Sequence, residues 1–178
     1  MKLVETPLAG AWVLELERLE DERGHFARTF DAELLVAHGM DARVAQSSTS
    51  FNRHAGTLRG MHFQTPPDEE TRIARVTRGA VFDVIVDLRE GSATRHAWFG
   101  VDLSAENGRS LYVPRGFAHG FQTLVDASEV LYVMSAPYVA EAARGVRWDD
   151  PAFGIVWPDA PGGRTISARD AEYPDVAA

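Results

Sequence analysis

The alternation of hydrophobic and polar residues predicts a chain built mainly from short β-strands. Extended runs follow one another, separated by glycine, asparagine, proline and aspartate residues that favour turns. The predicted strands span residues 13–19, 25–30, 43–52, 56–64, 72–77, 80–88, 98–103, 110–113, 119–124 and 130–135. Two of the turns, Arg78-Gly79 and Glu106-Asn107-Gly108, have the composition of hairpin turns. A short helix is predicted at residues 31–38, with Asp31 as its N-cap, and the chain beyond Trp148 is predicted to be irregular.

This spacing of strands, with no alternating long helices, indicates an all-β sandwich or barrel with a few short helices. A chain of 178 residues is expected to form a single domain over residues 1–178. The predicted strand 80–88 is informative because one face is fully apolar and the other mixed. Asp83 lies on the mixed face, which suits a jelly roll whose interior holds a ligand, whereas we expect Asp87 to face solvent.

Composition narrows the possible partners. The net charge of −8 argues against nucleic acid and anionic membranes, and an anionic ligand would need locally clustered arginines. The sequence contains no cysteine, so no disulfide framework or thiolate metal site is possible. No apolar stretch is long enough to span a bilayer, and we expect a cytoplasmic protein.

Candidate chemistry is concentrated in Gly56-Thr-Leu-Arg-Gly-Met-His-Phe-Gln64. A strict two-residue period would point Arg59 and His62 to opposite faces of this predicted strand. Glycine at position 60 permits a β-bulge, which would bring both side chains into the same cavity. The alternative is a satisfied core histidine beside a surface arginine.

The spacing of these residues resembles the two cupin motifs. The first motif is matched by Gly56, His62, Gln64, Glu69 and Gly79, and the second by Gly108, Pro114, Gly116 and His119. The resemblance implies a double-stranded β-helix, the cupin jelly-roll barrel. Metal-binding cupins have a second histidine where this chain has Gln64, and an amide is a weak ligand for transition metals. Two histidines and a glutamate still leave an iron or zinc site open.

Longer segments resemble the dTDP-4-dehydrorhamnose 3,5-epimerase family, over nearly the whole chain from Asp21 to Asp170. Besides the segment at 56–64, they are Phe82-Asp-Val-Ile-Val-Asp-Leu-Arg89, Val113-Pro-Arg-Gly-Phe-Ala-His-Gly-Phe121, Trp148-Asp-Asp-Pro151 and Ser167-Ala-Arg-Asp170. The resemblance implies an epimerase of a nucleotide-linked 4-keto-6-deoxy hexose that needs no metal or cofactor. A C4 ketone acidifies the C–H bonds at C3 and C5, and inversion requires a base on one face of the ring and an acid on the other.

The resemblance also implies roles for particular residues. His62 matches the base, Asp170 the carboxylate that orients it, and Tyr132 the general acid. The matching substrate-binding positions are Gln46, Arg59, His119 and Tyr138, with Arg23 and Phe26 supplied by the partner in a homodimer whose N-terminal strands are exchanged. We further hypothesise that Arg72, oriented by Asp83, stabilises the enolate.

Three other functions remain open at this stage. Arg72 replaces the lysine that is usual in the family, so an enzyme that inverts only C3 or only C5 is possible. A metal-dependent cupin oxygenase and a cupin that binds sugar without chemistry are the alternatives from other classes.

Overall fold

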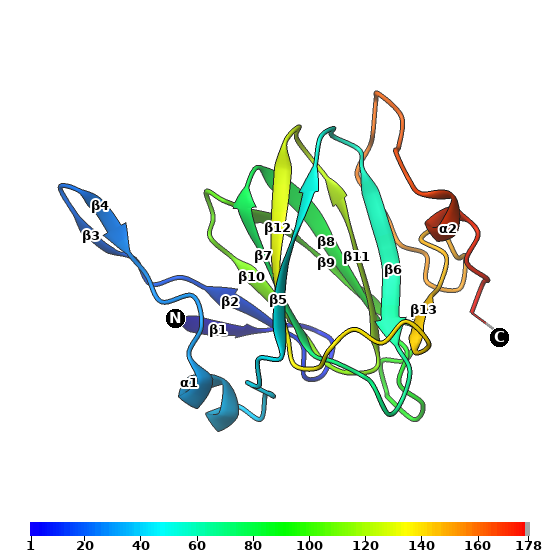
Figure 1. The fold of residues 1–178 in the computed structure, drawn as a ribbon, viewed down its shortest axis with the longest axis horizontal. Coiled ribbons are helices and arrows are strands. Elements are labelled where there is room, and N and C mark those ends of the chain that lie inside the picture. Colours follow the sequence, from blue (N-terminus) through cyan, green and yellow to red (C-terminus); the bar gives the residue numbers. More distant parts are fainter. Residues whose placement is uncertain (177–178) are drawn as a thin grey trace.

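The computed structural model describes residues 1–176, in which two antiparallel β-sheets face each other as a flattened barrel (Figure 1). One sheet has six strands in the order β1-β2-β10-β7-β12-β5. Their bounds are β1 (Lys2–Glu5), β2 (Trp12–Glu15), β10 (Ser110–Val113), β7 (Arg72–Arg78), β12 (Ser128–Met134) and β5 (Gln46–Asn52). Strand β5 lies at the edge of this sheet.

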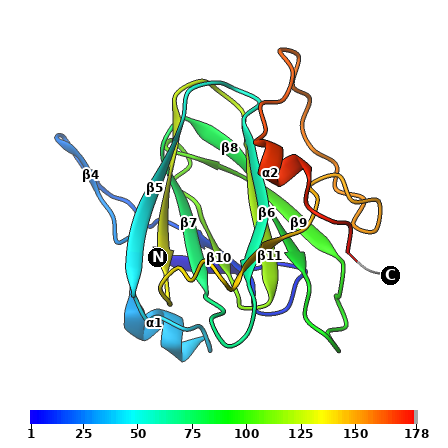
Figure 2. The same ribbon diagram turned by 45° about the vertical axis from the view of Figure 1, so that its right-hand side comes forward.

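The second sheet has five strands in the order β13-β6-β11-β8-β9. They are β13 (Ala143–Gly145), β6 (Leu58–Gln64), β11 (Phe117–Thr123), β8 (Ala80–Asp87) and β9 (Trp98–Ser104). Figure 2, turned by 45°, shows β6 of this sheet and β5 of the other sheet on opposite sides of the barrel. The all-β jelly-roll prediction is confirmed.

Side chains from both sheets fill one end of the barrel and form its main core. This core includes Val81 and Ile85 of β8, Phe121 of β11, Val76 of β7 and Val130 of β12. The mixed face of β8 therefore points inward, as predicted, because its apolar members reach the other sheet.

The outer, fully apolar face of β8 is covered by the C-terminal part of the chain. Val84 and Val86 pack there with Phe153 and Trp157, which belong to the segment predicted to be irregular. The same segment carries the short helix α2 (Ala168–Ala171) beside β6 (Figure 1). Burial of aromatic side chains against the sheet thus fixes the position of a helix that reaches the barrel cavity.

Three sequence expectations about β8 and its neighbours need correction. Asp87 is fully buried rather than in solvent, because Arg89, Ser92 and Thr94 all donate hydrogen bonds to its carboxylate. The turn at Arg78-Gly79 is not a hairpin, since β7 and β8 belong to different sheets.

The turn at residues 106–108 likewise joins β9 and β10 of different sheets. Turn composition predicts a reversal of direction but not which sheet receives the next strand. At Gly79, the hydroxyl of Ser128 bonds to both the N–H and the C=O of Ala80, which holds the chain at the crossing.

The N-terminal part of the chain forms an arm. The predicted strand 13–19 divides into β2 and β3 (Leu19–Asp21), and β3 pairs with β4 (Gly24–Phe26) in a hairpin. This hairpin projects away from the barrel on the side opposite the C-terminal segment (Figures 1 and 2). The helix α1 (Ala32–Ala37) follows, and the side chain of Asp31 caps it as predicted. No helix among residues 1–176 is long and apolar enough to cross a membrane.

Candidate active site

A β-bulge in β6 brings Arg59 and His62 to the same side of the strand, as predicted. His119 of β11 pairs with His62, whereas Phe121 pairs with Arg59, so a step of two residues on β11 faces three on β6. Gly60 has φ +123°, and a Cβ there would lie 2.6 Å from the Cα of Gly120. The close approach of the two backbones therefore requires glycine at the bulge.

Both residues line a polar cavity of about 400 Å³ between the two sheets. The lining residues come from β5, β6, β7, β11, β12 and the segment after β12. They are Gln46, Ser48, Thr49, Ser50, Arg59, His62, Arg72, His119, Gly120, Phe121, Tyr132, Met134 and Tyr138. The structure thus gathers seven of the predicted site residues around one cavity, from parts of the chain that are distant in sequence.

His62 is paired with the predicted carboxylate. Its Nε2 lies 2.9 Å from Oδ1 of Asp170, and Oδ2 of Asp170 accepts a hydrogen bond from the N–H of Gly60 at 3.1 Å. Burial raises the pKa of Asp170, but the hydrogen bonds from His62 and Gly60 outweigh burial and hold the pKa below its ordinary value. An ionised carboxylate only accepts, so Nε2 of His62 carries a proton and Nδ1 is left as the basic nitrogen.

A second histidine–carboxylate pair lies deeper in the barrel. Nε2 of His119 is 2.7 Å from Oδ1 of Asp83, and both side chains are buried. The ring of His119 meets the ring of Tyr132 edge to face, with centroids 6.0 Å apart. Desolvation raises the pKa of Tyr132 well above its ordinary value, and the charge of Asp83 raises it further, against smaller opposing effects of Arg72 and Arg59. The phenol therefore holds its proton firmly.

The expected contact between Arg72 and Asp83 is wrong. The carboxylate of Asp83 is used by His119, and the guanidinium of Arg72 is paired with Glu70 instead. Arg72 also donates from one terminal nitrogen to the backbone oxygen of His62 at 3.2 Å. Arg72 lines the cavity as predicted, but the carboxylate that orients it is that of Glu70, two residues earlier in the chain.

The remaining cavity residues are also held by specific contacts. Nε of Arg59 donates to Oδ1 of Asn52 at 2.7 Å, which leaves the other guanidinium nitrogens available to a ligand. The side-chain oxygen of Gln46 accepts from the backbone N–H of Tyr138 at 3.2 Å. The ring of Tyr138 lies at the cavity rim, and this residue is 60% exposed.

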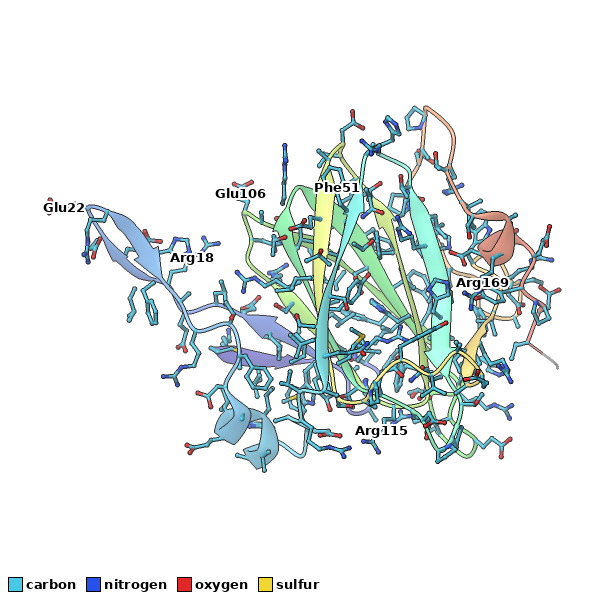
Figure 3. All side chains as sticks on the ribbon, in the orientation of Figure 1. Arg18, Glu22, Phe51, Glu106, Arg115 and Arg169 are labelled. Atoms are coloured by element: carbon cyan, nitrogen blue, oxygen red, sulfur yellow. The ribbon has the colours of Figure 1, made fainter. Side chains whose placement is uncertain are left out.

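Arg23 and Phe26 are not brought to the cavity of their own chain. Both lie on the projecting hairpin, whose tip carries Glu22 (Figure 3); Arg23 is in the turn and Phe26 ends β4, and the side chain of Arg23 is 85% exposed and Phe26 is 72% exposed. Arg23 is paired there with Asp21.

Several side chains at the site were missed in the sequence. Asn52 and Glu70 hold the two cavity arginines, and Tyr173 packs edge to face on His62 at 5.9 Å. Arg169 belongs to α2 (Figure 3) and, with His62, lines a second hollow of about 210 Å³. Tyr173 lies just beyond the end of α2, in the part of the chain predicted to be irregular, so no periodic pattern indicated it. Nothing in the local pattern distinguishes Glu70 from its acidic neighbour Glu69.

The donor set does not favour a metal ion. Within residues 1–176, no three His, Asp or Glu side chains are grouped closely enough to hold one. The amide of Gln64 is occupied, because its oxygen accepts from the N–H of Val139 and its nitrogen donates to the backbone oxygens of Asp68 and Pro137. Glu69, the expected cupin glutamate, lines a different hollow beside Arg89.

The jelly roll and the polar cavity between its sheets place the protein among the cupin-type enzymes. A family model described as dTDP-4-dehydrorhamnose 3,5-epimerase matches residues 5–178. The chain belongs to this family, and it is an epimerase.

Individual relatives agree with the family assignment. The dTDP-4-dehydrorhamnose 3,5-epimerase of Sinorhizobium fredii is 40% identical, over 95% of this chain and 86% of the relative. The enzyme of Methanothermobacter thermautotrophicus is 43% identical, over 88% of this chain and 84% of the relative. The crystal structure of the Bacillus anthracis enzyme, with TDP and PPi bound, has a TM-score of 0.93 and 39% identity and covers 98% of this chain and 99% of its own.

Proposed function

We propose that the protein inverts C3 and C5 of dTDP-4-dehydro-6-deoxy-D-glucose to give dTDP-4-dehydro-L-rhamnose. The observation that carries this proposal is that His62 and Tyr132 reach one cavity from opposite sheets. A sugar ring held between them would have a base on one face and an acid on the other. That is the arrangement which inversion of a carbon next to a ketone requires.

His62 is the proposed base. With Nε2–H directed at Asp170, Nδ1 accepts the proton from C3, and the negative carboxylate stabilises the imidazolium that forms. The electron pair of the C–H bond becomes part of an enolate whose charge lies on the C4 oxygen. The same steps at C5 complete the second inversion, and no electrons are gained or lost.

Tyr132 is the proposed acid. Because its pKa is raised, the phenol stays protonated at neutral pH and gives up its proton only to a strong base such as the enolate. The phenolate that results is then reprotonated. His119, in edge contact with Tyr132 and fixed by Asp83, is placed to contact the sugar.

Two arginines are proposed to bind different negatively charged groups of the substrate. Arg59, with its terminal guanidinium nitrogens available, is the proposed ligand of the diphosphate. Arg72, beside the backbone of His62, is the proposed partner of the C4 oxygen, where positive charge stabilises the transition state more than the ground state. Gln46 and Tyr138 at the rim are proposed to contact the nucleotide. The nucleotide and pyrophosphate bound to the B. anthracis relative support a ligand of this class.

The projecting hairpin suggests how the site is completed. We propose a homodimer in which Arg23 and Phe26 of each chain enter the cavity of the partner, where an arginine and an aromatic ring would meet the diphosphate and the base. The support is that both side chains are highly exposed and lie outside their own cavity. We also propose that this single-domain enzyme works in the cytoplasm, which fractionation of cells would test.

The proposed reaction is tested by incubation with dTDP-4-dehydro-6-deoxy-D-glucose in heavy water. Each inverted carbon should take up one solvent deuteron, so mass spectrometry should show two and NMR should place them at C3 and C5. Uptake at one carbon alone would identify a single-carbon epimerase. Binding of the nucleotide sugar without any uptake would contradict the proposed reaction.

A further inference from the structure

We propose that Glu70 is a positioning residue that directs the guanidinium of Arg72 and, through Gln64, links it to the segment carrying Tyr138. This inference rests on the proposed function, because it assumes that the cavity holds the substrate. It assigns a task to three side chains, those of Glu70, Gln64 and Gln46, which lie around the reacting groups rather than against the sugar.

The pair between Glu70 and Arg72 is well enclosed. The side chain of Glu70 is 6% exposed and that of Arg72 is 16% exposed. Oε1 of Glu70 accepts from Nε of Arg72 at 2.8 Å and also from one terminal nitrogen. The other terminal nitrogen donates to the backbone oxygen of His62 at 3.2 Å. Contacts on two sides restrict the rotation of the planar guanidinium, and one N–H of each terminal nitrogen is left for a ligand.

The other carboxylate oxygen of Glu70 connects this pair to Gln64. Oε2 accepts one hydrogen from Nε2 of Gln64, and the other hydrogen is shared between the backbone oxygens of Asp68 at 2.7 Å and Pro137 at 3.2 Å. The backbone N–H of Val139 points at Oε1 of Gln64 at 2.6 Å, and an N–H can only donate. This contact fixes which end of the amide faces Glu70, so the orientation of Gln64 is determined by its surroundings.

The segment from Pro137 to Val139 is thus held by two glutamines from different sheets. Gln46 of β5 accepts from the N–H of Tyr138, and Gln64 of β6 accepts from the N–H of the next residue. Tyr138 lies between these two contacts at the cavity rim. Movement of this segment would disturb Gln64, then Glu70, and finally the direction of Arg72. Tyr138, which would contact the nucleotide, and the guanidinium of Arg72, which would contact the enolate, are therefore held by one connected set of hydrogen bonds.

A double-mutant cycle tests whether Glu70 acts through Arg72. In heavy water, Glu70→Gln should lower kcat about tenfold with KM within about twofold of wild type, because a misdirected cation is felt mainly in the transition state. Arg72→Met should lower kcat further. In the Arg72→Met background, Glu70→Gln should change kcat less than about twofold. An unchanged kcat in Glu70→Gln, or the same tenfold loss in both backgrounds, would overturn the inference.

The control is Asp87→Asn, which also removes a buried carboxylate from an arginine but lies outside the cavity lining. It should lower the melting temperature without changing kcat or KM. Gln64→Leu should raise KM, because it releases the segment that carries Tyr138. A Gln64→Leu variant with wild-type KM would remove the proposed link to the rim.

A crystal structure of Glu70→Gln supplies a readout without turnover. The guanidinium of Arg72 should leave the backbone oxygen of His62, and an unmoved guanidinium would contradict the positioning role whatever the protein catalyses. Absence of deuterium uptake in the wild-type protein would instead contradict the proposed function. The two failures are therefore distinguishable.

Discussion

Asp170 lies 2.9 Å from His62 although 108 residues separate them in the chain. The contact depends on two local features that arise independently. Ser167 caps α2 and accepts from the N–H of Asp170, and the bulge at Gly60 turns a second donor toward the same carboxylate. The covering of the β8 face by the C-terminal segment is therefore part of the site, because it brings the carboxylate to the histidine.

The first prediction concerns this pair. His62→Ala should abolish deuterium uptake at both carbons, with kcat reduced ~10²–10⁴-fold. Asp170→Asn should lower kcat in the same range, since an amide can stabilise the wrong tautomer of His62. The pKa of Asp170 is below its ordinary value, so it stays ionised and the wild-type kcat should show no loss from protonation of Asp170 down to about pH 5. Wild-type turnover in His62→Ala would rule out the mechanism.

The second prediction separates the acid from the base. Tyr132→Phe should lose net inversion more than it loses deuterium uptake, because His62 can still form the enolate and return a deuteron to the original face. The raised pKa of Tyr132 keeps the phenol protonated, so the wild-type kcat should show no loss from its ionisation up to about pH 10. Equal loss of uptake and inversion in Tyr132→Phe would contradict its role as the acid.

Sequence periodicity predicted the strands well because each sheet buries one face, and the apolar face of β8 is visible as every second residue. It also predicted the bulge at Gly60, since a glycine between Arg59 and His62 lets the strand bring both polar side chains to one face. Sheet membership was not predictable at the two turns misread as hairpins. Whether a turn closes a hairpin or crosses between sheets depends on contacts such as Ser128 with Ala80, which are distant in sequence.

The site was predictable where a resemblance supplied the partners and less so where packing selects them. The cavity contains the predicted His62, His119 and Tyr132, brought together from three strands. The sequence analysis assigned Asp83 to Arg72 wrongly, because the alternation of side chains along each predicted strand placed both residues on faces that could point into the barrel. The structure gives Asp83 to His119, since these two residues lie on adjacent strands of one sheet, whereas Arg72 belongs to the other sheet.

The third prediction concerns stability. Burial raises the pKa of Asp87, but hydrogen bonds from Arg89, Ser92 and Thr94 outweigh burial and hold it at about 2, below its ordinary 3.8. A carboxyl group whose pKa is lowered by folding stabilises the folded state at pH values above its ordinary pKa. This stabilisation is lost as the pH falls through the pKa of the folded state. The difference corresponds to about 2 kcal/mol at neutral pH. Urea unfolding should show Asp87→Asn less stable by about this amount at pH 7 and nearly equal to wild type near pH 2. A difference that persists at low pH would show that packing, not charge, is responsible.

The fourth prediction is that activity needs no metal ion. The amide of Gln64 is occupied by Val139, Asp68 and Pro137, and Nε2 of both His62 and His119 faces a carboxylate. Dialysis against a strong chelator should therefore leave kcat unchanged. Gln64→Leu is the comparison, because it releases the segment from Pro137 to Val139 without adding a metal ligand, and its kcat should likewise not respond to the chelator. Loss of activity that iron or zinc restores would support a metal-dependent enzyme.

The last prediction tests whether the arm of one chain serves the cavity of the other. A chain with His62→Ala keeps its arm, and a chain with Arg23→Ala and Phe26→Ala keeps its base. If the arms are exchanged, the mixed dimer has one site in which base and arm are both intact. Random pairing of the two weakly active variants should then restore about a quarter of wild-type kcat per chain. The matched control mixes His62→Ala with Asp170→Asn, whose lesions lie in the same barrel, and should restore nothing. A mixture no more active than its separate components would show that Arg23 and Phe26 do not act in the partner's site.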